Sequence, residues 1–168
     1  MAGRSHSVTG SSRLLAVDAL RGFIIVLMAL DHANYFIAQK HSPGEYWGGS
    51  FPTYSEALPF LTRFVTHLAA PGFFFLMGAG MALFKAKQTR KSRSRPQIVA
   101  HFWIRGGLLI AVQFLIVNQV WRMSPGGWGP SIYIGVLFAL GGAMIICSLF
   151  LWWRSTYLLM LAATLFIA

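Results

Sequence analysis

The chain has 168 residues, of which 56% are hydrophobic and only 11% are charged. Its 14 Lys and Arg residues against 4 Asp and Glu residues give a formal net charge of +10. Because a soluble domain carries about a quarter charged residues, this composition excludes a disordered chain, a disulfide scaffold and an ordinary soluble enzyme. It predicts an integral membrane protein that is rich in cations and poor in acids.

Several stretches are long and apolar enough to cross a membrane as helices, which takes about 20 mostly apolar residues. These stretches are residues 14–37, 57–84, 98–121 and 132–153. A fifth stretch starts at Thr156 and reaches only to Ala168. We therefore predict an all-α, polytopic transmembrane helix bundle with four complete spans and the start of a fifth. We also expect the sequence to be the N-terminal piece of a longer membrane protein.

Basic residues predict the orientation of these spans. The loop after the second stretch carries Lys85, Lys87, Arg90, Lys91, Arg93 and Arg95. Short loops rich in Lys and Arg stay in the cytoplasm, and alternation of the spans then places the N-terminus there too. We prefer this interpretation of the basic loop to nucleic-acid binding.

The first stretch contains ionisable residues, which are costly in lipid and by default face the bundle interior or a water-filled cavity. They are Asp18, Arg21, Asp31 and His32. Helical spacing puts Asp18, Arg21 and His32 on one stripe, which we expect to face inward. Asp18 and Arg21 are three residues apart and can pair across a helical turn.

The second stretch carries Arg63 and His67, four residues apart on one helical face. They fall at roughly the depth of Asp31 and His32. We predict that the two helices gather these four residues around one buried polar pocket. The Arg63–His67 pair lies before Pro71, which together with the glycine after it permits a kink or break.

The remaining stretches contribute a cation and sites of close packing. Arg105 lies near the cytoplasmic side of the third stretch. The glycine pairs 106–107 and 141–142 predict notches where helices approach closely.

The predicted pocket suits proton transfer. A histidine titrating near neutrality removes a proton from a hydroxyl or amine, and an adjacent carboxylate, here Asp31 beside His32, fixes its tautomer. Arginines near the cytoplasmic mouth suit a phosphate-bearing substrate. The pocket thus fits general-base catalysis on an anionic donor, or proton-coupled transport. No metal site is predicted, because His32 and His67 lack a His-x-x-x-His or Cys pair.

Structural alternatives stay open for these residues. Asp18 with Arg21 is also explained as a neutralised pair at a helix start, and Arg63 as a side chain that snorkels to the interface. His67 is also explained by a hydrogen bond between helices.

Two segments resemble a known family. RLLAVDALRGFIIVLMALDHANYF resembles the opening helix of the transmembrane acyltransferases, and FLTRFVTHLAAPGFFFLMGAGMALF is similar to the second helix of bacterial relatives of heparan-alpha-glucosaminide N-acetyltransferase. The first match rests on Arg13, Asp18, Arg21, Gly22 and His32. The second rests on Arg63, His67, Ala70, Pro71 and Gly78.

The resemblance implies a multi-pass protein of the bacterial plasma (inner) membrane. Residues 1–13 would form a cytoplasmic tail, and residues 14–168 an acyltransferase-like transmembrane domain that is incomplete at its C-terminus. It implies transfer of an acetyl or acyl group from acetyl-CoA or another acyl-CoA, as donor substrate, to a sugar or similar acceptor. No permanently bound cofactor and no nucleic-acid partner are implied; the lipid bilayer is the expected surrounding, and a homo-oligomer is compatible with it.

The resemblance also suggests roles for single residues. His32 would be the catalytic base, oriented by Asp31, with His67 and Arg63 shaping the pocket. On depth and charge alone, Arg21 and Arg105 are candidates for binding the coenzyme A phosphates, and the predicted substrate-binding set also includes Arg63 and Asp18. The sugar acetyltransferase carries its histidine in the outer loop before the second helix, where this sequence has His41. The catalytic histidine therefore stays open between His32, His67 and His41, and the rival interpretations are a transporter or permease and a non-catalytic membrane subunit.

Overall fold

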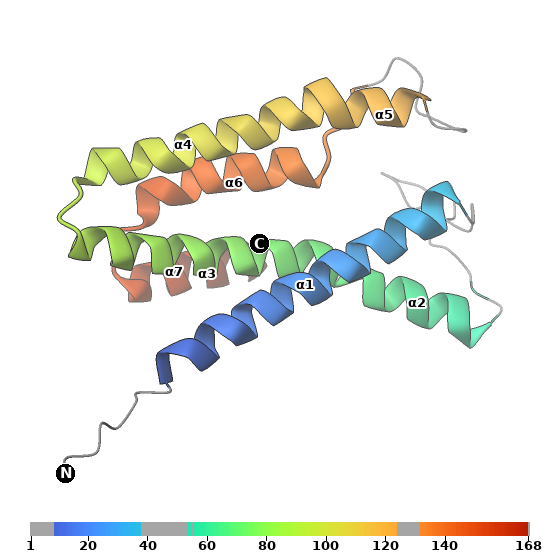
Figure 1. The fold of residues 1–168 in the computed structure, drawn as a ribbon, viewed down its shortest axis with the longest axis horizontal. Helices are drawn as coiled ribbons and strands as arrows, with labels where there is room; N and C mark the ends of the chain where they lie inside the picture. The colour runs from blue at the N-terminus through green and yellow to red at the C-terminus, as the bar shows by residue number, and fades with distance from the viewer. Residues whose placement is uncertain (1–8, 38–53, 55, 124–131, 168) are drawn as a thin grey trace, which may run out of the picture. The chain divides into compact units, whose positions relative to one another are not determined.

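The computed structural model describes residues 9–37, 54, 56–123 and 132–167. Within these ranges all regular structure is helical and no strand occurs. The elements are α1 (Thr9–Phe36), α2 (Ala57–His67), α3 (Ala69–Arg90), α4 (Arg95–Val112), the π-helical turn η1 (Gln113–Val117), α5 (Asn118–Met123), α6 (Val136–Phe150) and α7 (Ser155–Ile167) (Figure 1). The prediction of an all-α protein is confirmed.

Two of the expected spans are long and apolar enough to cross a membrane by length and composition. They are the helical runs Ala57–Arg90, with 34 residues, and Arg95–Met123, with 29 residues. Helix α6 has 15 residues and rises about 23 Å, short of a hydrocarbon core of about 30 Å. Helix α1 has 28 residues but includes charged residues among its apolar ones. The set of four complete spans therefore stays a prediction.

The second predicted stretch is broken into two helices. Helix α2 ends at His67, and α3 begins at Ala69. Pro71 has no N–H to donate to the carbonyl of His67, and its ring would clash with that carbonyl in a continuous helix. The break therefore falls where the proline requires it, as the sequence predicted.

The structure divides within α3 into two units, residues 1–76 and residues 77–168. In unit 1, α1 packs against α2, and Ile24 and Leu27 of α1 join Ala69 and Leu76 of α3 in a small core. Ile24 packs close to α3 at Gly72, where a Cβ atom would lie 2.5 Å from its Cδ1 atom. A larger residue than glycine there would force Ile24 to move.

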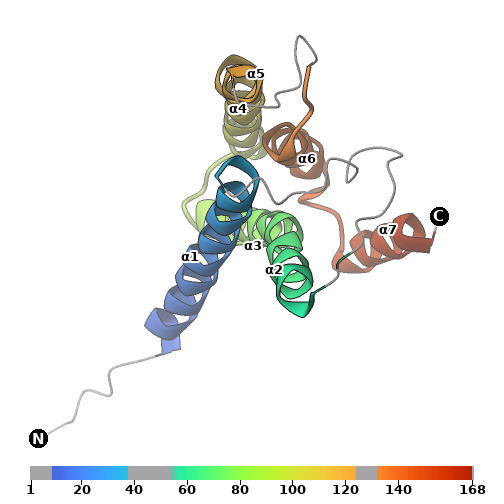
Figure 2. The ribbon, with the colours of Figure 1, turned by 90° about the vertical axis from the view of Figure 1, so that its right-hand side faces the viewer.

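In unit 2, α4 and α6 lie side by side, as Figures 1 and 2 both show. Their backbones meet at two glycines: a Cβ on Gly106 would lie 2.6 Å from the carbonyl oxygen of Gly141, and a Cβ on Gly141 would lie 2.5 Å from that of Gly106. This confirms the predicted notches at one glycine of each pair. The core of unit 2 is formed by Met81, Ile98 and Phe102.

Candidate functional site

An ion pair between α1 and α2 forms the centre of the candidate site in unit 1. Nη1 of Arg63 lies 2.5 Å from Oδ1 of Asp31. The Arg63 side chain is 21% exposed and that of Asp31 is 29% exposed, so both charges are largely withdrawn from the surface. Charge-assisted hydrogen bonds of this kind are short and about twice as strong as neutral ones. The structure thus brings together two of the four residues predicted for the pocket and shows how they are joined.

His32 follows Asp31 directly in the sequence, and His67 lies four residues after Arg63. The two histidines share one local geometry. Nδ1 of His32 lies 2.8 Å from the carbonyl oxygen of Met28, and Nδ1 of His67 lies 2.8 Å from that of Arg63, each one helical turn back. Because a carbonyl can only accept, Nδ1 carries the proton of each of these hydrogen bonds. In the neutral ring, Nε2 is then the basic atom. Both side chains are exposed in this chain, so both present a proton acceptor at the surface of unit 1.

This geometry assigns His32 a different orienting group from the predicted one. Asp31 was expected to fix the tautomer of His32, but its Oδ1 atom receives Arg63, and the Nδ1 atom of His32 bonds to its own helix. Adjacent residues in a helix point about 100° apart, since one turn takes 3.6 residues. Asp31 therefore contacts α2 while His32 points to a different, exposed side of α1.

Two threonines beside this site bond to their own helix, α2. Thr66 is buried, and its hydroxyl donates to the carbonyl oxygen of Arg63 at 3.0 Å. Thr62 donates to the carbonyl oxygen of Leu58 at 2.8 Å. Such bonds to a preceding turn fix the hydroxyls against their own helix, so neither hydroxyl reaches toward a ligand in this structure.

Asp18 and Arg21 form the predicted pair across one helical turn. Nη1 of Arg21 lies 3.1 Å from Oδ1 of Asp18. Their side chains are exposed, as is His32, so the stripe expected to face inward is not the packed face of α1. That face instead runs through Ile24 and Leu27. Asp31 and Asp18 are 13 residues apart, about 20 Å along the helix, so the two ion pairs are separate sites.

The other candidates do not join this cluster. Arg105 is exposed on α4 in unit 2. His41 lies outside the described residues. Among the described residues, no group of three or more His, Cys, Asp or Glu side chains could hold a metal ion.

A buried amide pair in unit 2 was not predicted. Nε2 of Gln113 donates to Oδ1 of Asn118 at 3.1 Å and to the carbonyl oxygen of Tyr133 at 3.3 Å. The pair spans the π-helical turn, where the N–H of Asn118 also bonds to the carbonyl of Gln113. A spacing of five residues places side chains on different faces of an α-helix, so only the π-helical turn brings this pair together.

Comparison with known families gives one match. The model of the family described as heparan-alpha-glucosaminide N-acetyltransferase, catalytic, matches residues 13–168. No curated protein and no solved structure matches the chain. The matched range includes both motifs from which the resemblance was inferred, and it extends through all the helices of unit 2. The chain therefore belongs to the heparan-alpha-glucosaminide N-acetyltransferase catalytic-domain family, an acetyltransferase-type family.

Proposed function

We propose that this chain is part of an integral membrane acyltransferase that moves an acetyl or acyl group from acyl-CoA to a sugar or similar acceptor. The observation that carries the proposal is the match of residues 13–168 to an acetyltransferase family. The exposed histidines, each with Nδ1 bonded to its own helix, and the partly buried ion pair support it, since they offer a base and a fixed charge pair.

The proposal places the protein in the bacterial plasma membrane, with four spans and a cytoplasmic N-terminus. The two long apolar runs support the membrane setting, because only 17% and 22% of their most apolar windows are buried by the rest of the chain. The central helix of a soluble protein would be mostly covered by its neighbours. The basic α3–α4 turn supports the orientation through the positive-inside rule.

In the proposed reaction, Nε2 of His32 takes a proton from the amine or hydroxyl of the acceptor. As it does so, the lone pair of the acceptor nitrogen or oxygen attacks the thioester carbonyl carbon. The carbon–sulfur bond then breaks, and coenzyme A leaves as the thiolate, which takes the proton back from the imidazolium. The carbonyl of Met28 holds the ring in the tautomer that this step needs. Arg63 and Asp31 hold α2, which carries His67, against α1.

Phosphate binding is assigned to cations away from the base. Arg21 is proposed to contact the phosphates of the donor, with Asp18 paired to its guanidinium in the absence of donor. Arg105 is proposed as a second phosphate contact. These roles rest on depth and charge alone, and they leave the acceptor unassigned.

Acetyl transfer by the purified protein in lipid nanodiscs tests the proposal. With radiolabelled acetyl-CoA and glucosamine, we expect His32→Ala to lower kcat by roughly a hundredfold or more, as loss of a general base does. We expect His67→Ala to have a smaller effect. Gln119→Ala, which removes an exposed polar side chain from α5, is the control and should keep full activity.

Two outcomes would overturn parts of the proposal. If His32→Ala and His67→Ala both retain turnover, the catalytic assignment is wrong. If the wild-type protein transfers no acetyl group but shows substrate-dependent proton flux in sealed vesicles, the site belongs to a transporter. Thermal unfolding of each variant distinguishes lost chemistry from lost folding.

A further inference from the structure

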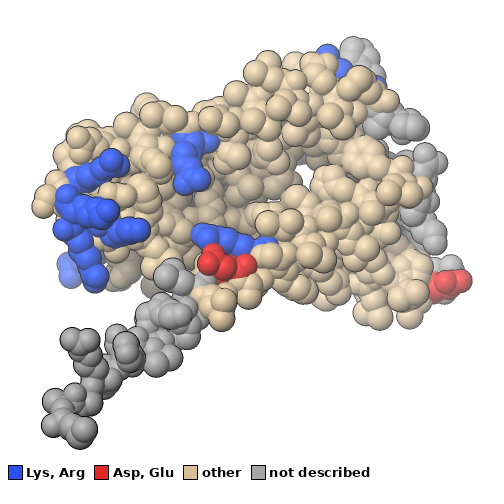
Figure 3. Space-filling model, viewed as in Figure 1, with Lys and Arg blue, Asp and Glu red and all other residues tan. Residues whose placement is uncertain are grey.

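Unit 2 is strongly basic and has no acidic residue in its sequence. All four acids of the chain, Asp18, Asp31, Glu45 and Glu56, precede residue 77, whereas nine Lys and Arg residues follow it. The cations of unit 2 therefore have no carboxylate side chain within the unit to pair with. Six of the nine lie between residues 85 and 95, and Figure 3 shows blue side chains gathered where α3 meets α4.

The turn between α3 and α4 holds its basic side chains outward in a defined shape. Ser92 has a φ of 56°, in the left-handed region, and the N–H of Arg93 closes the turn on the carbonyl of Gln88 at 3.2 Å. Ser94 and Gln97 then form a capping box at the start of α4. Arg90, Lys91 and Arg93 are exposed on this turn. The fold thus presents three cations together on an ordered scaffold.

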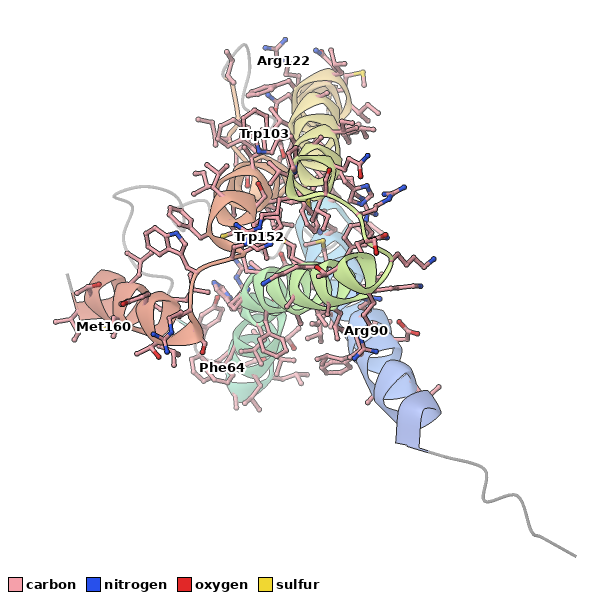
Figure 4. All side chains as sticks on the ribbon, turned by 90° about the vertical axis from the view of Figure 1, so that its left-hand side faces the viewer. Phe64, Arg90, Trp103, Arg122, Trp152 and Met160 are labelled. Atoms are coloured by element: carbon pink, nitrogen blue, oxygen red, sulfur yellow. The ribbon has the colours of Figure 1, made fainter. Side chains whose placement is uncertain are left out.

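Trp152, which follows α6, lies beside this turn and contacts its two flanking cations. Nζ of Lys85 lies 5.7 Å and Cζ of Arg95 lies 5.6 Å from the centre of the indole ring. Lys85 also donates to the carbonyl oxygen of Leu151 at 2.7 Å. Figure 4 shows Trp152 by the ribbon of α3, with Arg122 at the opposite end of the α4–α5 run. These contacts gather the ends of α3, α4 and α6 into one cationic surface.

We propose that this surface, defined by Arg90, Lys91, Arg93 and Arg95 with Trp152, binds anionic phospholipid headgroups of the membrane leaflet that it faces. The inference rests on the membrane setting of the proposed function. Anionic leaflets attract basic segments next to apolar helices, and tryptophan is enriched at headgroup level. The exposed cations lie on an open turn at the ends of two apolar helical runs. Lys85 and Arg95 already lie over the Trp152 ring, which argues against that ring stacking a purine of a nucleotide donor.

Lipid-dependent fluorescence quenching tests this inference. The full chain, purified in detergent, is titrated with phosphatidylglycerol or phosphatidylcholine carrying brominated acyl chains, and tryptophan quenching gives the affinity. We expect phosphatidylglycerol to bind at least tenfold more tightly. Arg93→Gln should weaken that preference about fivefold, and the triple variant Arg90→Gln/Lys91→Gln/Arg93→Gln should abolish it at low salt. Arg122→Gln, the matched single-charge control at the other end of unit 2, should leave it unchanged.

The outcomes separate this inference from the proposed function. If the triple variant keeps both its thermal stability and its preference for phosphatidylglycerol, the lipid site is wrong whether or not the protein transfers acetyl groups. If instead the triple variant raises the KM for acetyl-CoA in phosphatidylcholine nanodiscs while lipid preference is kept, the surface binds the donor. Loss of lipid preference with acetyl transfer intact supports the inference. A Trp152→Phe variant should lose the part of the lipid-specific quenching that comes from this ring, which places the lipid at this surface.

Discussion

Unit 1 and unit 2 hold their helices together by different means. Unit 1 contains every acidic residue of the chain, and a partly buried ion pair between Asp31 and Arg63 joins two of its helices. Unit 2 contains no acid, and its helices α4 and α6 approach until the backbones meet at Gly106 and Gly141. The first arrangement uses charge and leaves histidines exposed, whereas the second uses close contact of small residues.

This difference places the titratable groups near the helix contact in unit 1 and leaves the helix contact of unit 2 to packing alone. A polar contact between helices keeps titratable groups near one another, and the exposed imidazoles of unit 1 lie within one residue or one turn of its ion pair. Close glycine packing offers no reactive group but excludes larger side chains from the interface. We therefore expect substitutions in unit 1 to act on chemistry, and substitutions at the glycines of unit 2 to act on stability.

The largest expected loss of stability comes from the glycine contact. Gly106→Ala or Gly141→Ala puts a Cβ atom against a carbonyl oxygen of the facing helix, and backbone cannot move aside as a flexible side chain can. Overpacking of this kind costs about 1–3 kcal/mol, which corresponds to a fall in Tm of roughly 3–10 °C for a chain of this size. Thermal unfolding in nanodiscs measures it.

The neighbouring glycines supply matched controls. A Cβ atom on Gly107 or Gly142 meets nothing within 4 Å, and alanine favours a helix over glycine by up to about 1 kcal/mol. Both alanine variants should therefore unfold at or slightly above the wild-type temperature. If the four alanine variants behave alike, α4 and α6 do not meet as described.

The next largest effect is expected at the Asp31–Arg63 pair. Asp31→Asn leaves a partly buried guanidinium without this carboxylate. Arg63→Gln leaves the partly buried carboxylate of Asp31 without this guanidinium. A pair of intermediate burial should show a coupling energy of about 1–3 kcal/mol, between the values for exposed and fully buried pairs. A double-mutant cycle on thermal unfolding gives this number directly.

A charge swap tests whether the pair acts through attraction. Asp31→Arg combined with Arg63→Asp restores opposite charges across the α1–α2 contact, so it should recover part of the stability lost in either single reversal. If the swap is no more stable than the single reversals, the contact contributes through packing or through other partners of these residues.

The sequence predicted the helical class, the break before Pro71 and the pairing of Asp18 with Arg21, because each depends on residues close in the chain. It also predicted that Arg63 and Asp31 lie near one another, from their similar depth in neighbouring spans. Each of these inferences uses one simple rule: proline chemistry, helical spacing or the length of a span.

Other features could not be predicted from local rules. Helix α1 carries apolar residues on all its sides. Phe23, Ile25 and Val26 are exposed while Ile24 is buried, so hydrophobicity does not mark the packed face of α1. The π-helical turn has no sequence signal, and without it Gln113 and Asn118 point apart. The glycine pairs indicated close packing, but only the facing helix decides which glycine of each pair meets it.

The smallest effect on stability is expected at Asp18 and Arg21, whose side chains are 66% and 49% exposed. Exposed pairs one turn apart contribute about 0.5 kcal/mol or less, so Asp18→Asn and Arg21→Gln should each shift the Tm by no more than about 2 °C. The same variants separate in kinetics if Arg21 contacts the donor phosphates. Arg21→Gln should then raise the KM for acetyl-CoA, because a cation is lost, whereas Asp18→Asn should lower it, because the carboxylate no longer competes with phosphate for the guanidinium.

The opposite directions make this small site informative. A purely structural pair would give two variants that change the KM for acetyl-CoA in the same direction or not at all, in step with their Tm. Raising the salt concentration should reduce both kinetic effects, since exposed charges are screened over about 10 Å at 0.1 M. The Asp31–Arg63 pair, being partly withdrawn from water, should keep more of its coupling energy under the same salt. That contrast compares an exposed ion pair within α1 with a partly buried pair between α1 and α2.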